Sequence, residues 1–188
     1  MNEVIWSGLI CLVALLNFAN SLRGEFVFDD LLVLEANRKA RETGRGSSLR
    51  DLFRWLHGKR ALVLWTFRLN MTKAKNPMNP FFWHLPSVIV HSLTSVAVFF
   101  ILRHWFGLTA SGLGALVYAT HPLNSAIVPY ISSRSSILSS AFHMLALLSF
   151  LTGGWYTATI PLWAYLGGKT KEEILNLIPL FLIIWLVG

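Results

Sequence analysis

Long apolar runs, separated by short polar breaks, constrain this chain more than any other feature of its sequence. The runs lie near residues 4–22, 83–102, 108–121, 136–152, 155–167 and 173–188. A bilayer core of roughly 30 Å requires a segment whose backbone hydrogen bonds close within it, and a helix of about 20 residues is long enough to cross that core. The pattern therefore predicts an all-α, multi-pass membrane bundle of about six spans.

Composition and the ends of the runs refine this expectation. Charged residues make up 13% of the 188 residues and hydrophobic residues 54%, whereas a soluble domain carries roughly 25% charged residues. The first run lacks a preceding basic segment and a following cleavage site, which predicts a retained helix instead of a signal peptide. The single Cys11 excludes an intramolecular disulfide. We expect residues 1–188 to form one membrane module, which is a fragment or one part of something larger.

The longest polar segment, residues 23–82, leaves the orientation in the membrane open. It holds 12 of the 16 Lys and Arg residues, which favours the cytoplasm, yet its length lies at the limit of the positive-inside tendency. Within it, "SSLRDLFRWLHG" places Ser48 and Asp51 at capping-box spacing and then repeats apolar residues on one helical face. This stretch predicts an amphipathic helix lying in the membrane interface.

Alternation of six spans would bring three polar segments to one side of the membrane. These are residues 23–82, the break at 121–135 and the turn "GGKTKEE". Arg103 and the turn at Gly153 would lie on the other side. The chemically interesting residues on the shared side are Asp29, Asp30, Arg60, His121, Arg134, Lys171 and Glu172.

Five stretches of the sequence, taken in order, resemble one known family. They are "NSLRGEFVFDDLLVLEAN", Arg60, "FFWHLPSVIVHSLTSVAVFFILRHWFG", "GALVYATHPLNSAIVPYISSRSSILSSAFHMLALLSFL" and "KTKEEILNLIPLFLII". They look like the N-terminal membrane module of the transmembrane and tetratricopeptide-repeat-containing protein O-mannosyltransferases. Those proteins are GT-C type glycosyltransferases, so the resemblance implies a GT-C-like arrangement of the spans.

The resemblance implies transfer of a sugar, mannose in that family, from a polyprenyl or dolichyl phosphate lipid to a protein hydroxyl. The reaction takes place on the extracytoplasmic face, so residues 23–82 become the first extracytoplasmic loop. Compared with a full-length enzyme of this kind, residues 1–188 lack the C-terminal half. The implied partners are the lipid-linked sugar, an acceptor polypeptide, the lipid bilayer and a second membrane subunit that supplies this C-terminal half. No nucleic acid is implied. We favour the bacterial inner membrane over the membrane of the endoplasmic reticulum.

The family's acidic pair corresponds to Asp29 and Asp30. Transfer to a hydroxyl needs a base for its proton and cations for the departing phosphate. We predict Asp30 as the base, with Asp29 orienting it, and the two carboxylates as ligands of a divalent cation, Mg²⁺ or Mn²⁺. Arg and Lys bind phosphate by charge-assisted hydrogen bonds. The predicted phosphate-binding and lining residues are Arg60, Arg134, Lys171, His121, Glu172, His84 and His91.

The same residues also allow structural roles. Two adjacent Asp residues can cap a helix that begins at Leu31, and Lys171 with Glu172 can form a solvated turn. His84 can be a polar group at the membrane interface, whereas His91, deeper in the membrane, needs a partner.

Departures from the family pattern keep a second function open. Where the family carries a Thr-Glu step after the His-Pro pair, this chain has Ser125 and Ala126. Asn124 stands where a His is common, and Ser87 where an Asn is found. The alternative is therefore a degenerate, non-catalytic membrane module that binds lipid or a partner protein.

Overall fold

The structure is a computed structural model, and it describes residues 2–43, 60–73 and 78–171, together with residues 48, 50, 53, 76, 179, 181, 182, 184 and 186. In this part of the chain all regular structure is helical. The α-helices are α1 (Glu3–Asn17), α2 (Asp29–Thr43), α4 (Ala61–Lys73), α5 (Pro80–Leu102), α6 (Leu108–Thr120), α7 (Arg134–Thr152) and α8 (Ile160–Gly168). Four 3-10 segments lie between them: η1 (Ala19–Arg23), η2 (Pro122–Ala126), η3 (Ile131–Ser133) and η4 (Gly154–Thr159).

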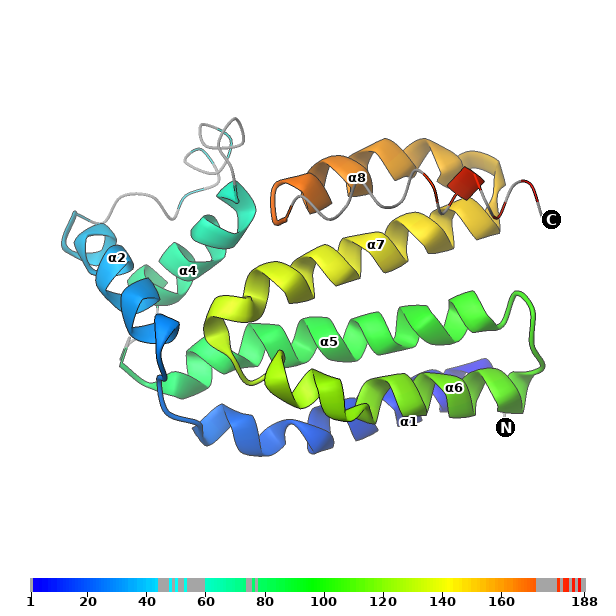
Figure 1. The fold of residues 1–188 in the computed structure, drawn as a ribbon, viewed down its shortest axis with the longest axis horizontal. Helices are drawn as coiled ribbons and strands as arrows, with labels where there is room; N and C mark the ends of the chain where they lie inside the picture. The colour runs from blue at the N-terminus through cyan, green and yellow to red at the C-terminus, as the bar shows by residue number, and fades with distance from the viewer. Residues whose placement is uncertain are drawn as a thin grey trace.

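A bundle of helices that run side by side is formed by α1, α5, α6, α7 and α8, and α2 and α4 lie together at one end of it (Figure 1). Helix α5 packs against α1, α6 and α7, and α8 packs against α7. Helices α1 and α6 approach closely at Gly112, where an added Cβ would lie 2.4 Å from the Trp6 ring. The all-α prediction is confirmed for the described residues.

Three helical segments are long and apolar enough to cross a bilayer: Glu3–Arg23, Pro80–Leu102 and Ile131–Thr152. They coincide with the predicted spans 4–22, 83–102 and 136–152, and they mark a membrane-associated protein. Helices α6 and α8 have 13 and 9 residues, or about 20 and 14 Å of helix, which is short for a bilayer core. The predicted amphipathic helix at 47–58 and the span at 173–188 fall largely outside the described residues.

Helix α5 shows how polar residues are accommodated in a membrane span. Asn79 caps its start by accepting a hydrogen bond from the Phe81 N–H at 3.0 Å. Within the helix, Ser92, Thr94 and Ser95 donate their hydroxyl hydrogens to carbonyls four residues back. These bonds satisfy groups that lipid cannot solvate.

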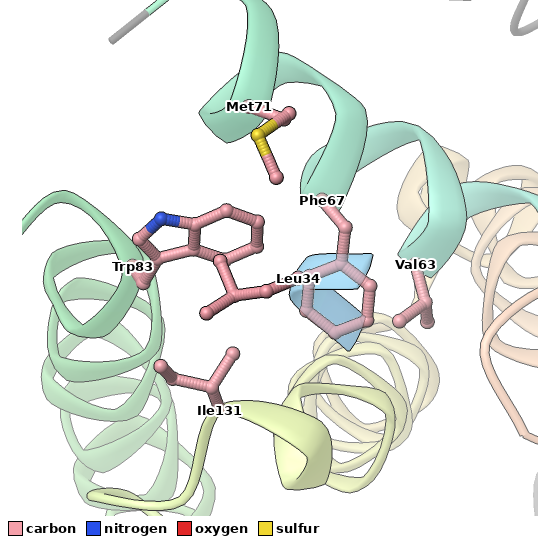
Figure 2. Close-up of a cluster of buried hydrophobic side chains, with 6 residues drawn as sticks. All are labelled: Leu34, Val63, Phe67, Met71, Trp83 and Ile131. Carbon is pink, nitrogen blue, oxygen red and sulfur yellow. The ribbon is translucent and has the colours of Figure 1, made fainter. Parts of the chain in front are cut away.

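An apolar cluster attaches α2 and α4 to the end of the bundle. Figure 2 shows its six side chains, which come from α2, α4, α5 and η3: Leu34, Val63, Phe67, Met71, Trp83 and Ile131. All six are buried. Burial of side chains of this size contributes roughly 1.5–3 kcal/mol each, so this cluster can hold the extramembrane helices in one position over the spans.

The opposite end of the bundle joins α1, α5 and the turn after α7. Arg103, directly after α5, makes an ion pair with Glu3 at 3.1 Å. Phe100 lines a cavity together with Trp155 and Tyr156. Arg103 and the Gly153 turn therefore lie at the end of the bundle away from α2.

Candidate functional site

The acidic pair is connected to residues 121–133, which we call the α6–α7 connector. Asp30 accepts a hydrogen bond on Oδ1 from the Ser132 N–H at 2.9 Å. The Asp29 N–H donates to the Tyr130 hydroxyl at 3.4 Å. The two Asp side chains differ in access, because Asp30 is 0% exposed whereas Asp29 is exposed. Only Asp29 presents its carboxylate to the surroundings.

The start of α2 explains this difference. Asp30 lies in the first helical turn, where the helix dipole favours carboxylates. Its Oδ2 also accepts from the Val27 N–H at 3.5 Å, which resembles the return bond of a capping box. The alternative of a cap for a helix beginning at Leu31 is not what the structure has, because α2 begins at Asp29 and the Asp30 carboxylate accepts from the Val27 and Ser132 N–H groups.

Arg134 is a buried side chain that links the start of α7 to α4 and α5. One guanidinium nitrogen, Nη1, donates to Asn70 Oδ1 at 2.7 Å and to Thr66 Oγ1 at 3.2 Å. The other, Nη2, donates to the Trp83 carbonyl at 2.6 Å. The guanidinium also lies 4.6 Å from the Phe67 ring centre. Since Arg134 is only 1% exposed, a phosphate could reach it only after these bonds had rearranged.

His84 lies in the same buried layer. Asp30 and Arg134 are close enough to act on it electrostatically. Its ring faces the backbone of Gly24 and Pro129, but neither ring nitrogen has a hydrogen-bond partner of normal geometry in the described part of the chain. Asp30, His84 and Arg134 therefore form a buried polar group beneath the exposed Asp29.

A second polar feature lies deeper in the bundle. A half-open cavity of about 70 Å³ is bounded by α5, α6, α7 and the α6–α7 connector, and this volume is enough for several water molecules. The His91 Nε2–H donates to the Ala119 carbonyl at 3.0 Å, so a neutral His91 keeps Nδ1 as an acceptor. The polar lining residues are His91, Thr94, Tyr118, Asn124, Ser136 and Ser140.

Lys171 brings a positive charge to this cavity. Its Nζ donates to Ser136 Oγ at 3.2 Å, and Ser136 belongs to the cavity lining. The α6–α7 connector contacts both the acidic pair and the cavity. Tyr130 and Ser132 bind the acidic pair, and Asn124 lines the cavity.

The remaining predicted residues lie elsewhere. Arg60 is exposed at the start of α4 and has a left-handed backbone with φ 53°. His121 is exposed at the end of α6, where its Nδ1 accepts from the Leu123 N–H at 3.3 Å. No hydrogen bond or ion pair joins either described residue to the acidic pair. Glu172 lies outside the described residues.

The acidic pair offers few ligands for a divalent cation. Across the described ranges, no group of three or more His, Cys, Asp or Glu side chains is placed to hold a metal ion. A cation at Asp29 would have to take most of its ligands from water or from substrate oxygens, as Mg²⁺ commonly does.

Sequence reasoning missed the partners of the two buried charges. Thr66 and Asn70 are four residues apart on α4, and this spacing on an apolar helix is the one signal that could have indicated a shared polar contact. Ser132 carried no such signal, because it binds Asp30 through its backbone N–H and such a donor exists at every residue except proline.

Known proteins resemble the chain at the level of sequence. It is 29% identical over 154 residues to mouse Protein O-mannosyl-transferase TMTC3, covering 76% of the chain and 16% of that protein. It is 31% identical over 160 residues to mouse Protein O-mannosyl-transferase TMTC1, covering 77% of the chain and 16% of that protein. For human Protein O-mannosyl-transferase TMTC4 the identity is 28% over 175 residues, with 77% and 23% covered.

These matches cover most of the chain but only a small part of each relative, between 16% and 23% in these three. No protein-family model matches the chain. No solved structure matches it either. The resemblance predicted from the motifs is confirmed: the chain is similar to one part of the transmembrane and tetratricopeptide-repeat-containing protein O-mannosyltransferases.

Proposed function

We propose that this chain is the N-terminal module of a GT-C type membrane glycosyltransferase with about six spans. It transfers a sugar, mannose by analogy with the relatives' names, from a polyprenyl or dolichyl phosphate lipid to a protein hydroxyl on the extracytoplasmic face. One observation carries the proposal: the α6–α7 connector binds the Asp29 backbone N–H and the buried Asp30 carboxylate, and it also lines a polar cavity with a lysine beside it.

The chemistry assigns a role to each feature. The bond between the anomeric carbon and the phosphate oxygen breaks, and the phosphate leaves with the electron pair. The acceptor oxygen forms the new bond to the anomeric carbon and gives its proton to a carboxylate. Asp30 is favoured as this base by the sequence, but its complete burial favours Asp29 for proton transfer and Asp30 for positioning. Lys171 stabilises the phosphate at the cavity, with His91 as a hydrogen-bonding partner.

The same proposal implies in which membrane the enzyme acts and from which side each substrate arrives. The lipid donor reaches the site from the bilayer and the acceptor polypeptide from the extracytoplasmic side, in the bacterial inner membrane or the endoplasmic reticulum. Further spans, or a second membrane subunit, complete the enzyme. A divalent cation, if used, binds between Asp29 and the donor phosphate.

The test uses the chain together with the further spans or second subunit that complete the enzyme. The complete protein is reconstituted in liposomes with radiolabelled polyprenyl-phosphate mannose and an acceptor peptide. We expect Asp29→Asn to reduce transfer at least 100-fold, because removal of a general base costs roughly 10²–10⁴ in rate. Asp30→Asn should also reduce transfer, because it removes the group that positions the first turn of α2. Lys171→Met should mainly raise KM for the donor. Arg103→Met, at the other end of the bundle, is the matched control and should leave transfer unchanged. Full turnover by both Asp variants, with normal membrane insertion, would sink the catalytic assignment.

A non-catalytic membrane module is the second candidate. Ala126, in η2, is exposed at the position where the family pattern has a carboxylate, and both Asp30 oxygens already accept backbone hydrogen bonds. Such a module would bind polyprenyl phosphate without transferring sugar. Donor binding in a filter assay, combined with no transfer by the completed protein, would select this candidate.

A further inference from the structure

The first turn of α2 exposes large apolar side chains. Phe28, which directly precedes the helix, is 84% exposed, and Leu31 and Leu32 are 56% and 68% exposed. We call Phe28, Leu31 and Leu32 the α2 apolar turn. Isolated exposed apolar residues are ordinary, but three within five residues form a patch that requires an explanation.

The α2 apolar turn is not the side of the helix that packs on the protein. The buried side of α2 carries Asp30, Leu34 and Asn37, at positions i, i+4 and i+7 of one helical face. Phe28 and Leu32 lie on the opposite face. The outward side chains are therefore not part of the cluster that attaches α2 to the bundle.

The depth of this turn relative to the spans is constrained from two sides. Asp30 bonds to Ser132, the second residue of the span Ile131–Thr152. Only residues 24–28 separate α2 from the end of the first span at Arg23, and five residues reach at most roughly 18 Å when fully extended. The turn consequently lies level with the ends of the spans, at the boundary of the bilayer.

The outer side of α2 changes character one turn later. Glu35 and Arg38 form an exposed ion pair at 3.2 Å. A helix whose first turn is apolar and whose next turns are charged matches the gradient from the acyl boundary to water.

The backbone at Phe28 supports this assignment. Its φ of 46° lies in the left-handed region, which a bulky residue rarely adopts and which glycine adopts without strain. Burial of the Phe28 side chain in lipid would contribute to offsetting that strain. An aromatic ring in the headgroup layer gains apolar burial, and this is the depth at which aromatic residues of membrane proteins gather.

We propose that the α2 apolar turn inserts into the interfacial layer of the lipid bilayer and holds α2 at that depth. The occupant of the patch is lipid, at the boundary between headgroups and acyl chains. Asp29 lies within the same turn, so its exposed carboxylate is held where a lipid-borne phosphate would present a sugar. This last consequence rests on the proposed function; the insertion itself does not.

The test measures the depth of the α2 apolar turn in the bilayer directly. It uses the chain together with the further spans or second subunit that complete the protein. In a Cys11→Ser background, a nitroxide is attached at Leu32→Cys, and separately at Arg38→Cys as the matched control on the charged part of α2. In phosphatidylcholine/phosphatidylglycerol liposomes, we expect the label at position 32 to collide mainly with dissolved oxygen and the label at 38 mainly with a water-soluble nickel chelate. The ratio of the two collision rates should differ at least fivefold between the positions.

Two results would overturn the proposal. Nickel accessibility at position 32 equal to that at 38 would place the turn in water, and an immobilised label at 32 shielded from both reagents would mean that protein covers the patch. Quenching of a Phe28→Trp variant by brominated lipids gives a second measurement that needs no cysteine, and absent quenching would likewise contradict insertion. None of these readouts depends on sugar transfer, so failure of the proposed reaction would leave them unchanged.

Discussion

Asp30 and Ser132 are 102 residues apart in the sequence, yet the Ser132 N–H donates a 2.9 Å hydrogen bond to the Asp30 carboxylate. This bond joins the first turn of α2 to the start of a membrane span. Because Asp30 is completely buried, no water replaces the bond when it is lost. The catalytic hypothesis for the acidic pair therefore has to be separated from this structural role.

Asp30→Ala should destabilise the contact between α2 and the α6–α7 connector. The change leaves the Ser132 and Val27 N–H groups without an acceptor, at a cost of about 1–3 kcal/mol for a buried unsatisfied donor. We expect a lower thermal midpoint in detergent and faster hydrogen exchange at the Ser132 amide. Asp29→Ala, at an exposed side chain, serves as the control and should change stability by no more than about 1 kcal/mol. Equal exchange rates at Ser132 in the two variants would contradict the structural role of Asp30.

Loss of Arg134 should be among the most damaging single changes in the described part of the chain. Arg134→Met leaves Asn70 and the Trp83 carbonyl without their donor, and removal of one partner from a buried charged network costs about 3–5 kcal/mol. Arg134→Lys should not restore stability, because an ammonium group cannot replace the planar, divergent donors of a guanidinium. Chemical denaturation in detergent measures both variants.

A double-mutant cycle locates the Arg134 effect. Asn70→Ala combined with Arg134→Met should cost less than the sum of the single changes, because the two residues share a 2.7 Å hydrogen bond. Arg103→Ala breaks a partly exposed ion pair with Glu3 and should cost less than about 1 kcal/mol. Strict additivity of the first pair would mean that the bond contributes nothing.

Gly112→Ala should weaken the packing of α6 on α1. A Cβ there would lie 2.4 Å from the Trp6 ring, and overpacking of this kind costs about 1–3 kcal/mol. Gly8→Ala is a matched control in α1, since a Cβ at Gly8 meets nothing within 4 Å and alanine favours the helix by roughly 0.5–1 kcal/mol. Thermal unfolding should therefore shift in opposite directions for the two variants. A stabilising Gly112→Ala would show that the two helices separate more easily than the structure indicates.

Orientation can be decided by cysteine labelling. Single cysteines at Glu25 and Gly107, in a Cys11→Ser background, lie at opposite ends of the bundle, and both positions are exposed. If residues 23–82 are extracytoplasmic, an impermeant maleimide applied to intact cells labels position 25 and not position 107. Labelling at 107 alone would place the acidic pair in the cytoplasm and remove the basis for transfer on the outer face.

The sequence by itself determined the class and the main spans. Apolar runs of the required length predict helices because the bilayer leaves no other way to satisfy the backbone, and three of the predicted spans coincide with helices long enough to cross. The ordered motifs also indicated a resemblance to one part of a known family, and the similarity to its members confirms this resemblance. The alternation of the runs placed Asp30, Arg134 and Lys171 at one end of the bundle, where the structure has them.

Only the tertiary structure decided what these residues contact. Asp30 and Arg134 have the residue types of a catalytic base and a phosphate ligand, but the fold buries both side chains. Asp30 is bonded to Ser132, and Arg134 is bonded to Asn70 and Trp83. Lys171 instead contacts Ser136 at the edge of a polar cavity. Residue type fixes which hydrogen bonds a side chain can make. The packing of segments far apart in the chain fixes which partners are within reach and whether water can compete with them, and that information is not local to any stretch of sequence.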